Sequence, residues 1–165
     1  MRWLLALFAS FLSGPLLACD LALALAVDVS GSVDPEEFNL QRDGLAAALR
    51  DPVIGEALVR SRARVMVVQW TGSGRQKVTV PWVDIRNFVD VETLAARVAA
   101  DKRVWRNFST AVGEALTFTA RAFPNPPVCK RRLVDVSGDG RSNEGTPPEE
   151  VKPMLAAMDI SVNAL

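Results

Sequence analysis

The segment Leu21–Val27, "LALALAV", is apolar at every position. A strand with one face in water alternates apolar and polar residues, so this run predicts a strand covered on both faces, as in a parallel sheet between helices. The segment "DPEEFNLQRDGLAAALR" follows, with Asp34 as a helix N-cap, Pro35 at the first helical position and Glu37 at the third. The chain therefore opens with a strand followed by a helix.

Strand and helix signals continue to alternate along the chain. Strands are expected in "RVMVVQW", "RRLVDVS" and "ISVNAL", and helices in "VETLAARVAADK", "STAVGEALTFTARAF" and "TPPEEV". Ser109 and Thr146 are expected to cap the last two helices, and Pro153 implies that the last helix is kinked or begins later than Pro147. "KVTVPWV" is expected to form a hairpin with "RVMVVQW", and Pro81 suits an edge strand.

This order of elements predicts an α/β fold. We expect a Rossmann-like, doubly wound, mostly parallel central sheet with helices on both faces and one antiparallel edge strand. The length of 165 residues suits one domain. Because "ISVNAL" stands at the end of the chain, we also expect the C-terminal part of the fold to be truncated, leaving an incomplete sheet edge that is open to association.

The N-terminus has the pattern of a targeting segment. Arg2 precedes the apolar stretch Trp3–Leu17, which is too short and too interrupted for a membrane span of about twenty residues. We predict that residues 1–18 are a secretory signal peptide and that residues 19–165 form an exported domain, periplasmic in a double-membraned bacterium. No later segment has the pattern of a transmembrane span, so none is expected after signal cleavage.

Composition excludes several classes of function. Nineteen basic and nineteen acidic residues cancel, and the longest run of like charge is the triplet at 130–132, so the chain lacks the basic stripe of a nucleic-acid-binding protein. It also contains no histidine. Ser-His-Asp and Cys-His catalysis in their usual form are therefore excluded, as are zinc and iron sites built on histidine.

Oxygen-bearing side chains gather at the predicted strand ends. Asp28, Ser30 and Ser32 follow the first strand at every second position, Asp139 follows a later strand, and Thr110 opens a helix. Because ligands of doubly wound sheets bind at the carboxyl ends of the strands, we expect these side chains to meet at one edge. Carboxylate and hydroxyl oxygens in such a set suit Mg²⁺, which retains waters and open coordination positions.

Three motifs at these positions resemble a known family. "DVSGS" is similar to the D-x-S-x-S signature of von Willebrand factor type A domains, "STAVGEAL" to their threonine loop and "SGDGRS" to their aspartate-glycine loop. "CDLALALAVDVSGSVDPEEF" and "RRLVDVSGDGRSNEG" resemble a bacterial branch, domain-of-unknown-function family 1194. The resemblance spans about residues 20–165. It implies a metal-ion-dependent adhesion site (MIDAS) for Mg²⁺ or Mn²⁺, with ligands at Asp28, Ser30, Ser32, Thr110 and Asp139.

Each motif also has a simpler interpretation. Asp and Ser at strand ends are ordinary turn residues. "DVSGDG" is similar to the start of an EF-hand calcium loop, but the twelfth position is Thr146 rather than glutamate and the preceding "RRLV" favours a strand. "GSGRQK" lacks the spacing of a phosphate-binding loop and falls in the predicted hairpin.

The resemblance also makes a prediction for the two cysteines. Cys19 lies nine residues before Asp28, and Cys129 lies ten before Asp139. If the two strands are parallel neighbours, as in the family, the cysteines meet at the opposite end of the sheet, within disulfide distance. The alternative is a lipoprotein, because "LLAC" resembles a lipobox in which Cys19 would carry the lipid.

Three functions remain open at this stage. The first is a non-enzymatic binding module, with no catalytic residues, whose divalent cation accepts an acidic side chain from a partner protein. The second is a metal-assisted hydrolase or phosphotransferase at the same edge, which would need a nucleophile or general base other than histidine. The third is a scaffold that keeps the fold and holds no ion.

Overall fold

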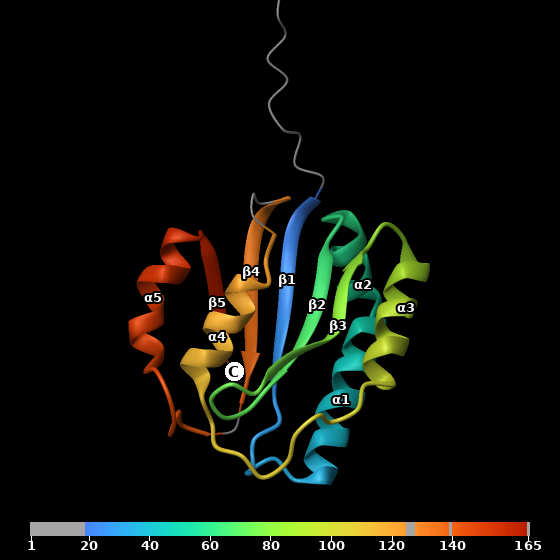
Figure 1. Ribbon diagram of the computed structural model, residues 1–165. Coiled ribbons are helices and arrows are strands. Elements are labelled where there is room, and N and C mark those ends of the chain that lie inside the picture. The colour runs from blue at the N-terminus through green and yellow to red at the C-terminus, as the bar shows by residue number, and fades with distance from the viewer. Residues whose placement is uncertain (1–18, 125–127, 139, 165) are drawn as a thin grey trace, which may run out of the picture.

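The computed structural model describes residues 19–124, 128–138 and 140–164, and these form a five-stranded sheet (Figure 1). The strands are β1 (Cys19–Asp28), β2 (Arg64–Trp70), β3 (Gln76–Asp84), β4 (Cys129–Ser137) and β5 (Ile160–Ala164). Their order is β3-β2-β1-β4-β5. Only the pair β2–β3 is antiparallel, and it places β3 at an edge. The predicted α/β fold with one antiparallel edge strand is confirmed.

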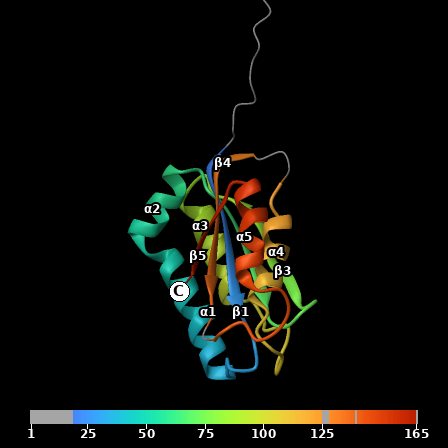
Figure 2. The ribbon, with the colours of Figure 1, turned by 90° about the vertical axis from the view of Figure 1, so that its left-hand side faces the viewer.

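Five helices within the described residues cover the two faces of the sheet. They are α1 (Pro35–Arg50), α2 (Pro52–Arg60), α3 (Phe88–Ala99), α4 (Val112–Arg121) and α5 (Pro148–Ala157). Figure 2 views the molecule from the side, with α1 and α2 on one side of the sheet and α4 and α5 on the other. No helix in the described parts of the chain is long and apolar enough to cross a bilayer.

The central strand β1 is packed on both faces, as its unbroken apolar run predicts. Ala22, Ala24 and Ala26 belong to the core beneath α4 and α5. Leu25 points the other way, into the core formed with α1, α2 and α3. The face with alanines receives larger side chains from the neighbouring strands, including the fully buried Trp70. Apolar burial on both faces fixes the position of β1, and with it the position of Asp28 at its end.

The local signals at α1 and β3 are confirmed. Asp34 caps α1 in a capping box: its carboxylate accepts the N–H of Glu37, and the Glu37 carboxylate accepts the Asp34 N–H at 2.8 Å. Pro81 lies in the edge strand β3, where a missing N–H leaves no gap in the sheet. The sequence predicted both because capping and proline chemistry depend on near neighbours only.

Two predicted helix caps are wrong. The helix α4 begins at Val112 without a side-chain cap on Ala111, so Ser109 is not its cap. Instead the Val112 N–H donates to the Ser142 hydroxyl at 3.3 Å, from a loop thirty residues away in sequence. The helix α5 begins at Pro148, so Thr146 is not its cap. The start is one residue later than Pro147, and Pro153 still lies within the helix.

The helix α2 lies in a region for which the sequence predicted no element. Asp51 caps it by accepting the N–H groups of Val53 and Ile54. Its nine residues include Gly55, where an added methyl group would stand 3.3 Å from the Phe88 ring, so glycine allows α2 to approach α3 closely. Short helices of this kind depend on tertiary packing, which sequence periodicity does not report.

A disulfide joins Cys19 and Cys129 at the amino ends of the neighbouring parallel strands β1 and β4. The two Cα atoms are 4.6 Å apart and both residues are buried. The bond lies at the end of the sheet opposite to Asp28. Nine residue steps of β1, at about 3.3 Å each, separate the two ends by about 30 Å.

Candidate functional site

The end of β1 presents three of the predicted residues within one tight turn. Asp28 and Ser30 are both 0% exposed, whereas Ser32 lies at the surface. The Ser30 N–H donates to Asp28 Oδ1 at 2.7 Å, and the hydroxyl oxygens of Ser30 and Ser32 are 3.2 Å apart. The alternating D-x-S-x-S spacing therefore gathers a carboxylate and two hydroxyls at the carboxyl end of the strand.

Thr110 reaches the same edge from the loop that precedes α4. The Gly31 N–H, in the turn after β1, donates to the Phe108 carbonyl at 2.7 Å, which ties the two loops together. Thr110 is buried, and its N–H and carbonyl are paired at 2.9 Å with the side chain and the backbone N–H of Asn143. The loop after β4 thus holds Thr110 in place.

The third predicted loop is located by two glycines. A methyl group on Gly138 would stand 3.1 Å from Asp28 Oδ2, and one on Gly140 would stand 3.9 Å from Thr110 Oγ1. The loop after β4 therefore passes directly over both predicted ligands. Asp139, the residue between these glycines, lies outside the described residues.

Arg103 holds the turn after β1 from the loop before α4. Its Nη2 donates to the carbonyls of Val29 and Ser30 at 3.0 and 2.8 Å. Burial lowers the pKa of this guanidinium, and the nearby charge of Arg106 lowers it further, whereas the Asp28 carboxylate opposes this shift. Arg103 and Asn143 were not predicted, because no local motif marks residues whose role is to anchor another loop.

The chemistry of the donor set fits a divalent cation. The described residues contain no group of three or more His, Cys, Asp or Glu side chains that could hold a metal. Instead, one fully buried carboxylate, Asp28, shares a turn with the hydroxyls of Ser30 and Ser32, and Thr110 reaches the same edge of the sheet on another loop. These are hard oxygen donors, and Gly138 leaves space where a larger side chain would crowd the Asp28 carboxylate.

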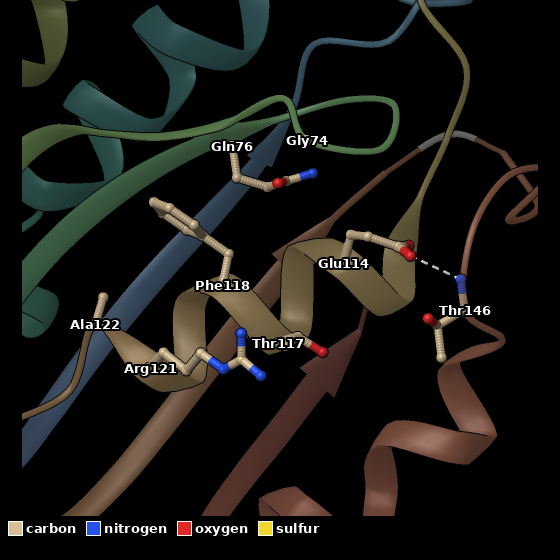
Figure 3. Close-up of a pocket in the computed structure, with 8 residues that line it drawn as sticks. All are labelled: Gly74, Gln76, Glu114, Thr117, Phe118, Arg121, Ala122 and Thr146. Atoms are coloured by element: carbon tan, nitrogen blue, oxygen red, sulfur yellow. Dashed lines mark hydrogen bonds between the residues drawn. The ribbon is translucent and has the colours of Figure 1, made fainter.

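An open cleft of about 690 Å³ lies beside this edge, between α4 and the β2–β3 turn (Figure 3). It is lined by Gly74, Gln76, Glu114, Thr117, Phe118, Arg121, Ala122 and Thr146. Glu114 closes one end, because its carboxylate accepts the Thr146 N–H at 2.8 Å. Among the predicted ligands that the structure describes, none lines the cleft, so the cleft is separate from Asp28, Ser30, Ser32 and Thr110.

The family is shown by comparison with known proteins. The family described as protein of unknown function (DUF1194) matches residues 18–165. The chain belongs to this family. The resemblance to domain-of-unknown-function family 1194 that the sequence motifs indicated is thus confirmed for nearly the whole chain. No functionally curated protein matches this DUF1194 chain in sequence.

Solved structures share the fold of this DUF1194 domain. Proximal thread matrix protein 1 (PTMP1) from the mussel byssus is 20% identical over 88% of the chain, with a TM-score of 0.67, and it is also known with a zinc-occupied MIDAS motif. BatB from Bacteroides thetaiotaomicron is 16% identical over 87% of the chain, with a TM-score of 0.58. The chain spans only 37% of the PTMP1 chain and 65% of BatB, and at these identities the likeness concerns the fold alone.

Proposed function

We propose that this DUF1194 domain is a non-enzymatic, metal-dependent protein-binding module. The ligands of the ion are Asp28, Ser30, Ser32, Thr110 and Asp139, and the ion is Mg²⁺ or Mn²⁺. The observation that carries the proposal is the meeting of three loops at one sheet edge, where Gly138 lies against the buried Asp28 carboxylate and Gly140 lies against Thr110.

The donor set suits binding of an acidic partner. A bound divalent cation supplies a positive charge that can accept a further carboxylate. Asp28, held in orientation by the Ser30 N–H, and Asp139 contribute one negative charge each, and the three hydroxyls contribute none. With so few charged ligands the ion can still accept a further carboxylate, so an acidic side chain of a partner protein is the expected ligand. The zinc-occupied MIDAS motif known for PTMP1 supports this type of site on this fold.

Hydrolysis or phosphoryl transfer at the same edge is the weaker alternative. The chain has no histidine to act as a base. Two acidic residues in the surrounding loops are already engaged with backbone N–H groups: Asp34 caps α1, and Glu144 accepts the Ser73 N–H at 3.2 Å. Neither is placed as a spare general base beside Asp28, which favours a binding role.

Export is part of the proposal. Disulfides persist in oxidising compartments, so the Cys19–Cys129 bond suits a secreted or periplasmic domain that follows a signal peptide at residues 1–18. The bond also occupies the Cys19 sulfur that a lipid anchor would need, which favours the exported form without a lipid.

The test is calorimetric titration of the protein with Mn²⁺ and Mg²⁺. Asp28→Asn removes the buried charged ligand and is expected to lower ion affinity at least about 100-fold, more than the loss of a supporting residue does. Asp135→Asn is the matched control. Asp135 is half-buried beside α1, on the face of the sheet opposite to the one that α4 and α5 cover. Circular dichroism checks that both variants fold. Equal ion affinity in wild type and Asp28→Asn would reject the site.

A further inference from the structure

Three arginines stand on the loops that form the candidate site or on the β2–β3 turn next to them. Arg75 lies in the β2–β3 turn, Arg106 in the loop before α4, and Arg141 in the loop after β4. We call them the cationic rim. Among the residues that the structure describes, none of the three takes part in an ion pair. Their charges are therefore available to a partner.

Arg75 is held in a fixed orientation. Its guanidinium stacks over the Phe108 ring at 3.9 Å from the centroid, and its Nη1 donates to the Ser73 carbonyl at 3.1 Å. The Phe108 side chain is 38% exposed, and its backbone carbonyl accepts the N–H of Gly31, within the D-x-S-x-S turn. A stacked guanidinium loses less conformational freedom on binding than a free one, so Arg75 is prepared to pair with a carboxylate.

The other two arginines are also connected to the site. Arg106 lies close enough to Arg103 to lower the pKa of that guanidinium, and Arg103 binds the carbonyl of Ser30. Arg141 directly follows Gly140, which lies against the hydroxyl of Thr110. Both arginines are exposed. The three arginines thus stand on separate loops, each connected to a loop that carries predicted ligands.

Three acidic side chains in or next to these loops accept hydrogen bonds from groups within the fold. Asp34 caps α1. Asp101 accepts hydrogen bonds from Gln69 and Thr79 at 3.0 and 2.6 Å. Glu144 accepts a backbone N–H of the β2–β3 turn. These carboxylates keep their negative charge, but each is hydrogen-bonded within the fold, whereas the three arginines have no ion-pair partner among the described residues.

We propose that the cationic rim selects an acidic protein segment with more than one carboxylate. The inference rests on the proposed function: one carboxylate of the segment binds the ion, and a second pairs with Arg75, whose planar guanidinium can bind it in a bidentate manner. Arg106 and Arg141 attract the acidic residues on either side, which raises the association rate and rejects basic partners.

An acidic protein suits this rim better than a nucleic acid does. Three guanidiniums around one site can match a short cluster of carboxylates. A nucleic acid needs a longer basic stripe that follows its phosphates, and the chain has no net positive charge.

The test is fluorescence anisotropy in Mn²⁺ with two labelled glycine–serine peptides of equal length, one with a single aspartate and one with four adjacent aspartates. We expect the four-acid peptide to bind at least about tenfold more tightly, and Arg75→Gln to remove most of that advantage. Arg75→Lys keeps the charge without the planar fork and should restore only part of it. Arg131→Gln, an exposed arginine in the half of β4 near Cys129, should change nothing.

The outcomes separate this inference from the proposed function. If Mn²⁺ binds but both peptides have the same affinity, or Arg75→Gln has no effect, the cationic rim is refuted and the metal site stands. If Mn²⁺ does not bind, yet the four-acid peptide binds in EDTA and loses affinity on Arg75→Gln, the rim stands and the metal site is refuted. Tighter binding of an oligothymidylate of equal charge would overturn the choice of a protein partner.

Discussion

Opening the disulfide between Cys19 and Cys129 should strongly destabilise this domain. The bond joins residues 110 positions apart in sequence. In the loop-entropy model, a closed loop of about 110 residues removes about 16 cal/mol/K from the unfolded chain, or about 4.8 kcal/mol at 25 °C. Residual structure in the unfolded state reduces this figure, so we expect a loss of about 3 to 5 kcal/mol. That is a large share of the 5 to 15 kcal/mol typical of a domain.

The assay is urea unfolding of the oxidised and the reduced wild-type protein, which differ only in the bond. With a slope of about 2 kcal/mol per molar urea, the midpoint should fall by about 2 M on reduction. The double variant Cys19→Ala and Cys129→Ala should resemble the reduced protein. Because the bond lies about 30 Å from Asp28, the reduced protein should keep its Mn²⁺ affinity while it remains folded. A midpoint shift below about 0.5 M would refute the reasoning.

Two further predictions concern the site and the surface. Gly138→Ala places a methyl group 3.1 Å from Asp28 Oδ2 and should lower the Mn²⁺ affinity about tenfold, as measured by calorimetry. Gly140→Ala is the control, because its methyl group would have its nearest contact at 3.9 Å, and it should leave the affinity within about twofold of wild type. Equal losses of affinity in the two variants would contradict this geometry. The Arg50 guanidinium holds the pKa of Glu92 below its usual value, so their ion pair stabilises the fold at neutral pH and this contribution is lost as the pH falls below about 4. The urea midpoints of wild type and Glu92→Gln should therefore differ at pH 7 and converge in acid, and a gap of constant size would refute the assignment.

The elements predicted correctly are those whose signals are local. The unbroken apolar run in β1 requires cover on both faces, and the capping box of α1 involves residues three positions apart. Parallel strands place their carboxyl ends at one edge, so the positions of Asp28 and Thr110 at that edge followed from the order of elements. The pairing of the cysteines followed from the same alignment, taken from the family resemblance.

The elements that were missed depend on distant residues. The helix α2 has a capping aspartate, but its short length and internal glycine give a weak helical pattern, and its packing partner Phe88 comes thirty-three residues after Gly55. The start of α4 is set by Ser142 rather than by the adjacent Ser109. A cap supplied from another loop leaves no mark in the residues around the helix end.

The sequence alone determined the order of the strands and of all helices but α2. It also determined that Asp28, Ser30, Ser32 and Thr110 stand at the carboxyl edge, because periodicity, capping and strand direction act over short distances along the chain. The tertiary structure decided how those residues are held. Arg103 binds the Ser30 carbonyl across 73 positions, and Asn143 fixes Thr110 across 33. Hydrogen bonds of that span form only after the sheet has brought the loops together, so no local pattern encodes them.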